Sequence, residues 1–217
     1  SGKELAEASL QAVQTQASLG MATNNDVLTA QEAVKTAEAG IISIQSSIQS
    51  VKQNLQVMTG WAYNSQPEIA PMPQVDVTRI DSMNPETDLE KALETNYTLM
   101  IDKRTLENTD DAANQQIARQ TIANDEQKIA SGLTDLYNQV LQARDSYNQA
   151  QSALALEEQN MAATQTRYDL GMVSRLEYLQ AQNTYVQSQA DFRIQELSLQ
   201  AAMDAYDWAL KGSLTLS

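Results

Sequence analysis

Residues 165–184 read QTRYDLGMVSRLEYLQAQNT, and an earlier stretch, residues 14–33, reads QTQASLGMATNNDVLTAQEA. An offset of 151 residues separates the two stretches, and each contains a Leu-Gly-Met triplet in the same register. Eight of the twenty positions are identical, and in the first copy they are Gln14, Thr15, Leu19, Gly20, Met21, Leu28, Ala30 and Gln31. A match of this kind at a fixed offset indicates an internal repeat, so we expect the two stretches to fold alike.

The repeated stretch carries the signals of a helix that ends, turns and begins again. The glycine of each triplet can adopt the left-handed conformation that commonly terminates a helix. Thr23 and Asp26 have the spacing of a capping box for the next helix, and the second copy retains this spacing as Ser174 and Glu177. Because the connection is short, the flanking helices must run antiparallel. Each copy is therefore predicted to be a long hairpin with the glycine at its tip.

Proline, a strong helix breaker, is confined to one part of this 217-residue chain. All four prolines lie within residues 61–87, which we therefore predict to be an irregular connector. The remaining sequence is rich in Ala, Gln, Leu, Glu and Lys, which favour helix. We expect helices at residues 3–17, 25–59, 88–108, 111–168 and 175–211.

Two of the predicted helices carry apolar residues at alternating steps of four and three. The first seam is Ala30, Val34, Ala37, Ile41, Ile44, Ile48, Val51, Leu55 and Met58. The second is Ile129, Leu133, Leu136, Val140, Ala143, Tyr147, Ala150 and Leu154. A repeat of seven residues indicates left-handed coiled-coil packing against partner helices, and an ordinary long bundle helix is the alternative.

These signals predict an all-α protein of elongated antiparallel coiled-coil hairpins, with very long helices and an irregular Pro-rich connector. The predicted parts are a first hairpin at 1–60 with its tip at 18–25, the connector at 61–87, a second helical repeat at 88–212 with its tip at 169–175, and a tail at 213–217. The incoming helix of the first hairpin is short. From this we expect the native chain to extend further upstream.

Composition argues against several classes of function. Cys and His are both absent, which excludes thiol and imidazole catalysis and metal sites built from these residues. Acidic residues outnumber basic ones by 28 to 14, and the resulting net charge of −14 repels nucleic acid. No apolar run approaches the roughly 18 residues of a membrane-spanning helix. We therefore expect no enzymatic activity, no cofactor, no metal, no nucleic-acid partner and no membrane span.

The two tip motifs resemble those of the TolC-like outer-membrane efflux protein family. The resemblance rests on YDLGMVS at 168–174 with LQAQ at 179–182, and on the earlier copy at 19–31. The segment DLEKALETN at 88–96 is similar to the one that opens the family's second structural repeat. Together these segments are spread over most of the chain.

The resemblance implies a role in transport. Members of the family are homotrimers whose hairpins form a hollow α-barrel across the periplasm. Their hairpin tips converge on a closable entrance and dock the helical hairpin of a periplasmic adaptor, or membrane fusion, protein. The adaptor in turn couples the barrel to an inner-membrane pump. The chain is thus expected to be the conduit of a tripartite efflux or type I secretion-like system, located in the periplasm and cell envelope.

The resemblance also implies site residues. The adaptor-docking surface is expected at Leu19, Gly20, Met21, Ala22, Leu170, Gly171, Met172 and Val173. Residues of an entrance constriction are expected at Asp26, Tyr168 and Glu177, and we hypothesise that Asp26 and Tyr168 form a latch. The chain departs from the family pattern at Val173, where an arginine is expected, and at Gln180, where an acid is expected.

A second interpretation is a structural coiled-coil filament or scaffold protein of the flagellin type, with no transport role. Such proteins are likewise rich in Ala, Gln and Asn and free of Cys. The duplicated tip favours the conduit, because a filament subunit has no need of two matched Leu-Gly-Met turns. The mass in solution separates the two interpretations, since a conduit closes into a trimer and a filament grows without end.

Overall fold

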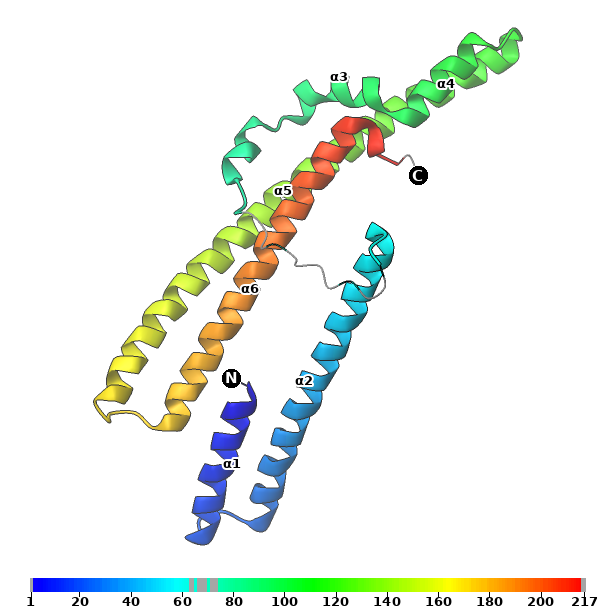
Figure 1. The fold of residues 1–217 in the computed structure, drawn as a ribbon. Coiled ribbons are helices and arrows are strands. Elements are labelled where there is room, and N and C mark those ends of the chain that lie inside the picture. The colour runs from blue at the N-terminus through cyan, green and yellow to red at the C-terminus, as the bar shows by residue number, and fades with distance from the viewer. Residues whose placement is uncertain (1, 63–64, 66–69, 71–73, 216–217) are drawn as a thin grey trace. The chain divides into compact units, whose positions relative to one another are not determined.

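A computed structural model describes residues 2–62, 65, 70 and 74–215. Helix makes up 87% of the structure, and no strand occurs among these residues, which confirms the expected all-α class (Figure 1). Part of the predicted connector, including Pro67, Pro71 and Pro73, lies outside the described residues. The chain divides into two compact units. The first consists of residues 1–72 and 154–189, and the second of residues 73–153 and 190–217.

The first unit contains a helical hairpin formed by the first two helices. Helix α1 spans Gly2–Ser18 and helix α2 spans Asn24–Thr59, and the two pack against each other along the whole of α1. Lys3 Nζ lies 3.0 Å from a carboxylate oxygen of Glu38, and this ion pair marks where α1 begins beside α2. Helix α2 ends at Gly60, whose φ of 70° supplies the left-handed cap.

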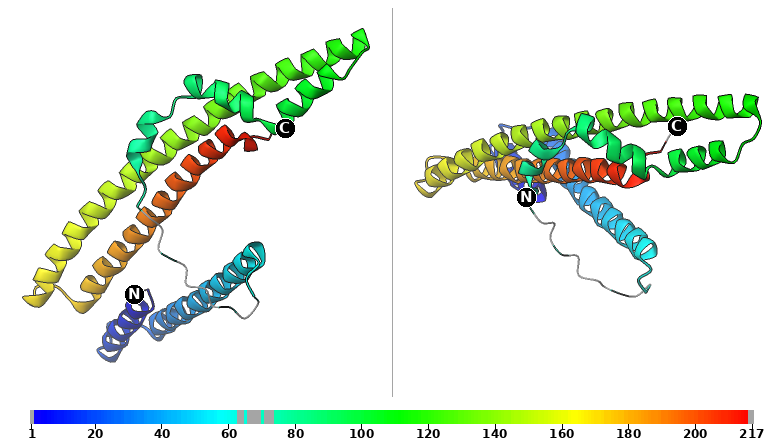
Figure 2. Two further views of the ribbon diagram at one scale, coloured as in Figure 1. Left: turned by 45° about the horizontal axis from the view of Figure 1, so that its top comes forward. Right: turned by 90° about the horizontal axis from the view of Figure 1, so that it is seen from above.

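Two helices, α5 and α6, have residues in both units. Helix α5 spans Ala112–Asp169, a continuous stretch of 58 residues, and helix α6 spans Arg175–Trp208. The views in Figures 1 and 2 agree that α5 and α6 lie side by side in each unit. Their contact is made in part by aromatic rings, because the centroids of Tyr147 and Phe192 are 5.3 Å apart.

The core of the second unit combines the predicted seam of α5 and the facing side of α6 with buried residues of the segments before α5. Ile129, Leu133 and Val140 of α5 are fully buried. The α6 side of the core, together with the turn that follows it, consists of Leu199, Met203, Tyr206 and Ala209. The heptad pattern of α5 thus marks the buried face of that helix.

The segment before α5 differs from the sequence prediction in two respects. The sequence predicts one helix at 88–108, but the structure has α3 at Pro85–Thr95 and α4 at Tyr97–Glu107, separated at Asn96. The predicted irregular connector also contains a 3-10 helix, η1, at Val77–Ser82, and α3 already begins at Pro85. Proline is compatible with this position because the first helical residue needs no amide donor.

Asn96 separates α3 from α4 because its side chain binds two other parts of the backbone. The side-chain oxygen accepts a hydrogen bond from Leu99 N at 3.1 Å and so caps α4. The amide nitrogen donates to the carbonyl oxygen of Leu214 at 3.0 Å. Asn96 is 1% exposed, so both bonds form out of contact with solvent. The break between α3 and α4 is therefore held by the far end of the described chain.

The sequence predicts the end of α6 at residue 211, but the α-helix stops at Trp208 and a π-helical turn, η2, follows at Ala209–Ser213. Gly212 lies in this turn with a φ of 91°. Its Cα faces α3 so closely that a Cβ at this position would meet the Thr95 carbonyl oxygen at 2.1 Å. Only glycine allows this approach.

Two polar contacts attach the end of α6 to the segments before α4. The buried Tyr206 hydroxyl donates to the Asp88 carboxylate at 2.7 Å, and Arg79 of η1 pairs with Asp207. None of the helices in the described part of the chain has both the length and the apolar character needed to cross a membrane.

Candidate functional site

The two turns predicted from the internal repeat have the same backbone geometry. In the first, Met21 N donates to Gln16 O at 2.8 Å and Gly20 N donates to Ala17 O at 3.0 Å. These two bonds make a Schellman motif, in which the glycine occupies the left-handed position. Gly20 has a φ of 70°, as this motif requires. The turn is therefore set by local hydrogen bonds and needs no support from the rest of the protein.

The second turn repeats these bonds 151 residues later. Met172 N donates to Arg167 O at 2.8 Å and Gly171 N donates to Tyr168 O at 2.9 Å. The φ of Gly171 is also 70°. Both turns belong to the first unit, and the views in Figures 1 and 2 place them at the same end of it.

Both acids predicted at the entrance are used as helix caps. The backbone amide and the hydroxyl of Thr23 each donate to an Asp26 carboxylate oxygen at 2.7 Å. The Ser174 amide donates to the Glu177 carboxylate, also at 2.7 Å. These bonds stabilise the charged form. The pKa of Asp26 is lowered, chiefly by the Thr23 hydroxyl and then by its amide, and the pKa of Glu177 is lowered, chiefly by the Ser174 amide.

The apolar residues of the turns point into solvent. Leu19, Met21, Leu170 and Met172 are between 69% and 75% exposed. Exposed leucine and methionine side chains beside a glycine offer an adaptable apolar surface with little steric hindrance. We call these four residues and the two glycines between them the tip surface. The other two predicted docking residues, Ala22 and Val173, are half-buried.

The tyrosine of the predicted latch has a partner that the sequence does not reveal. The Tyr168 ring stacks on Tyr178 with centroids 4.6 Å apart and an interplanar angle of 23°. Tyr178 lies one residue after Glu177 in the first turn of α6, and the first copy has Val27 at the equivalent position, so the repeat gives no signal for an aromatic pair. The described contacts of Asp26 and Tyr168 are thus with Thr23 and Tyr178. The latch between them remains a prediction.

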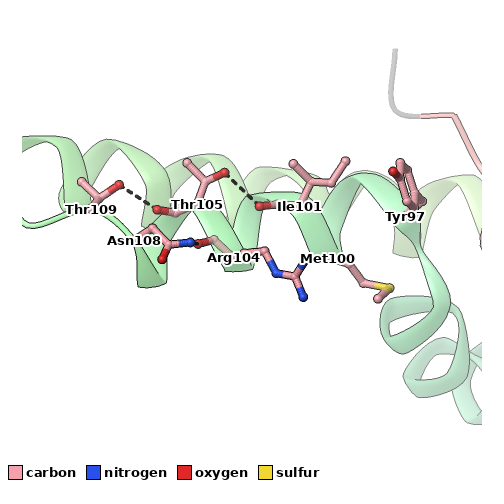
Figure 3. Close-up of a pocket in the computed structure, with 7 residues that line it drawn as sticks. All are labelled: Tyr97, Met100, Ile101, Arg104, Thr105, Asn108 and Thr109. Atoms are coloured by element: carbon pink, nitrogen blue, oxygen red, sulfur yellow. Dashed lines mark hydrogen bonds between the residues drawn. The ribbon is translucent and has the colours of Figure 1, made fainter.

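A second surface lies on α4. Its residues form a shallow depression along one side of the helix, lined by Tyr97, Met100, Ile101, Arg104, Thr105, Asn108 and Thr109 (Figure 3). The two threonine hydroxyls donate to Ile101 O and Thr105 O in the same helix. Hydroxyls that are used in this way have no donor left for a ligand. The depression offers exposed apolar surface through Tyr97, Met100 and Ile101.

A cluster of acidic side chains would be a further candidate site. Among the described residues, no group of three or more carboxylate side chains is placed to hold a metal ion. One pair of acids does meet in the second unit. The Asp102 carboxyl of α4 faces Asp125 of α5, and burial and this neighbour raise the pKa of Asp102. The tip surface is therefore the strongest candidate site in the described chain.

Comparison with known proteins does not assign the chain to a family. No family model matches the chain, and no curated protein matches it.

Proposed function

We propose that this chain is a subunit of an export conduit, in which the tip surface docks a periplasmic adaptor protein. The observation that carries the proposal is the pair of matched turns, each with a left-handed glycine between two exposed apolar side chains. Local hydrogen bonds fix both turns, so neither leucine nor methionine is needed to stabilise the fold at the tip. Apolar residues kept at such exposed positions are typical of a surface that binds another protein.

The chemistry of the tips favours a helical partner. Two apolar side chains on either side of a glycine leave the backbone accessible between them, which allows close packing of another helix end. The cap acids lie immediately behind the turn, so polar groups surround the apolar contact. An apolar centre with a polar rim is the usual arrangement of a protein interface. The adaptor hairpin that the family resemblance implies fits this surface.

Lateral assembly is supported by a difference between the two copies of the repeat. Leu179 in α6 is 6% exposed, whereas the equivalent Leu28 in α2 is 54% exposed. Helix α6 has α5 on one side and α1 near it on another, because a Cβ on Gly2 would lie 3.9 Å from Asn183 Oδ1. A second copy placed beside α2 in the same way would cover Leu28. We propose that three such steps close a ring, which is the homotrimer of the resembled family.

Docking is tested by crosslinking. The chain contains no cysteine, so Met172→Cys introduces a unique thiol at the second tip. We expect this variant to form a disulfide with cysteines placed at the hairpin tip of a candidate periplasmic adaptor protein. Leu156→Cys is the matched control, because Leu156 is an exposed apolar residue of α5 outside the tip surface. Equal crosslinking at both positions, or none at position 172, contradicts the proposed docking.

The latch has its own test. Tyr168→Phe removes the hydroxyl and retains the ring that stacks on Tyr178. If Asp26 and Tyr168 close the entrance, reconstituted channels of this variant have a higher conductance than the parent channels. Unchanged conductance rejects the latch without affecting adaptor docking. The mass of the chain in solution addresses the filament alternative, because open-ended growth contradicts a closed ring.

A further inference from the structure

Each tip places one methionine directly after its left-handed glycine. Met21 is 75% exposed and Met172 is 70% exposed. The space beside each glycine is open, because a Cβ added to Gly20 or Gly171 would meet no atom within 4 Å. The chain contains no cysteine, so the thioether sulfur of methionine is the side-chain group that oxidants attack most readily. Both tips therefore present an oxidisable sulfur to solvent, at the same position of the repeat.

The turns themselves do not depend on the methionine side chains. The Schellman bond of each turn is donated by the backbone amide of the methionine, at 2.8 Å to Gln16 O in the first turn and at 2.8 Å to Arg167 O in the second. A chemical change at the sulfur leaves these backbone bonds in place. Met203 differs, because it is fully buried in the core of the second unit, where a polar group would disrupt packing. Oxidation at the tips thus changes the surface and preserves the fold.

We propose that Met21 and Met172 are a matched pair of reversible oxidation sites that control docking at the tip surface. The consequence for docking rests on the proposed function, whereas the oxidation sites themselves do not. The oxidant is a peroxide. Hydrogen peroxide transfers one oxygen atom to the sulfur lone pair as its O–O bond breaks, so that the sulfur is oxidised by two electrons to the sulfoxide and the other oxygen leaves as water. Methionine sulfoxide reductases reverse the step, with two thiols oxidised to a disulfide and the sulfoxide oxygen released as water.

Oxidation changes half of the apolar side chains of the tip surface. The other two are Leu19 and Leu170, which carry no group that peroxide oxidises. A sulfoxide oxygen accepts hydrogen bonds, and burying it against an apolar partner without a donor is unfavourable. When both methionines are oxidised, we therefore expect docking to weaken by roughly 10-fold or more. A docked partner covers the same two sulfurs, so it should in turn slow their oxidation.

The sites are tested first without any partner. The full chain is exposed to dilute hydrogen peroxide, and the oxidation of each methionine is followed by peptide mass spectrometry. We expect Met21 and Met172 to react at similar rates, both at least roughly 10-fold faster than the buried Met203. Far-UV circular dichroism should not change while the tips react, and the two sulfoxide reductases should restore the original mass. Tip rates no higher than that of Met203, or helix loss as the tips react, overturn the proposal.

The effect on docking is tested with the candidate adaptor protein that crosslinks at position 172. The chain is oxidised and freed of peroxide before the adaptor is added, so the adaptor itself is not modified. The chain with both Met21→Leu and Met172→Leu retains an apolar tip that cannot be oxidised. Its docking before and after peroxide should be equal, whereas docking of the parent chain should fall. Met100→Leu is the matched control, because Met100 is 55% exposed but lies on α4, outside the tip surface. That variant should remain as sensitive to peroxide as the parent.

The outcomes separate this proposal from the proposed conduit. Equal docking of the oxidised and the untreated parent chain overturns the control of docking and leaves the conduit standing. If no adaptor crosslinks at position 172 in the absence of peroxide, the conduit is rejected and the control of docking with it, while the rate and repair measurements still decide the oxidation sites. A docked adaptor that protects Met100 from peroxide and leaves Met21 and Met172 unprotected overturns the proposal as well.

Discussion

Replacing Gly212 by alanine should be among the most destabilising single-methyl changes in this chain. The added Cβ would lie 2.1 Å from the carbonyl oxygen of Thr95 and 2.9 Å from its carbonyl carbon, whereas ordinary contact begins at 3.4 Å. The atoms that it meets belong to the backbone of α3, which cannot rotate away as a side chain would. The turn or the helix must therefore shift.

The expected cost has two parts. Alanine in the left-handed conformation costs about 1–2 kcal/mol relative to glycine. Forcing apart a packed contact adds about 1–3 kcal/mol. The total loss in free energy of unfolding is therefore about 2–5 kcal/mol. Gly60→Ala separates the two contributions, because Gly60 has a φ of 70° and a Cβ added there would meet no atom within 4 Å. For that control we expect only about 1–2 kcal/mol.

Two tryptophans allow each site to be followed separately. Trp208 precedes Gly212 in the second unit, and Trp61 follows Gly60 in the first. Urea unfolding monitored by fluorescence in Trp61→Phe and Trp208→Phe backgrounds reports the stability of each unit. The midpoint and slope give the free energy. Equal losses for Gly212→Ala and Gly60→Ala would refute the reasoning, because the close approach to Thr95 would then carry no cost.

Two further predictions concern the second unit. Tyr206→Phe keeps the buried ring and removes the hydroxyl that donates to Asp88, and should cost about 1.5–3 kcal/mol in urea unfolding; an unchanged midpoint would show that this bond contributes nothing. Asp102→Asn should stabilise the protein at neutral pH, because burial and Asp125 raise the pKa of Asp102 above 3.8 in the folded state, so its ionisation is costly there. The advantage should vanish as the pH falls below 3.8, and a gain that persists in acid would contradict this explanation.

The parts of the fold that could be predicted from sequence are those set by near neighbours. A glycine followed three residues later by a hydroxyl and then an acid specifies a Schellman turn and a capping box within about ten residues. Both turns accordingly have the expected form, with left-handed Gly20 and Gly171. The seam of α5 was likewise visible because heptad spacing reports burial directly.

The parts that were missed depend on distant residues. The break at Asn96 has no proline or glycine to mark it, and it is held by a hydrogen bond to Leu214 that a local pattern cannot show. The stack of Tyr168 on Tyr178 joins the two sides of a turn. The internal repeat could not predict this stack, because only the second copy has the two tyrosines. The seam predicted in α2 is a different case, because Ile44 and Val51 are exposed and the spacing alone does not say which helix covers them.

The hydrogen bond between Asn96 and Leu214 has a consequence for the order in which the protein is made. The two residues are 118 positions apart, so a ribosome completes α4 and all of α5 and α6 before the carbonyl partner of Asn96 emerges. Until then, Asn96 at the break between α3 and α4 can form only one of its two side-chain hydrogen bonds. Closing so long a loop is entropically expensive. The break between α3 and α4 should therefore be among the last parts of the fold to form during biosynthesis. The two tips should be among the first to form, because their backbone hydrogen bonds span five residues at most.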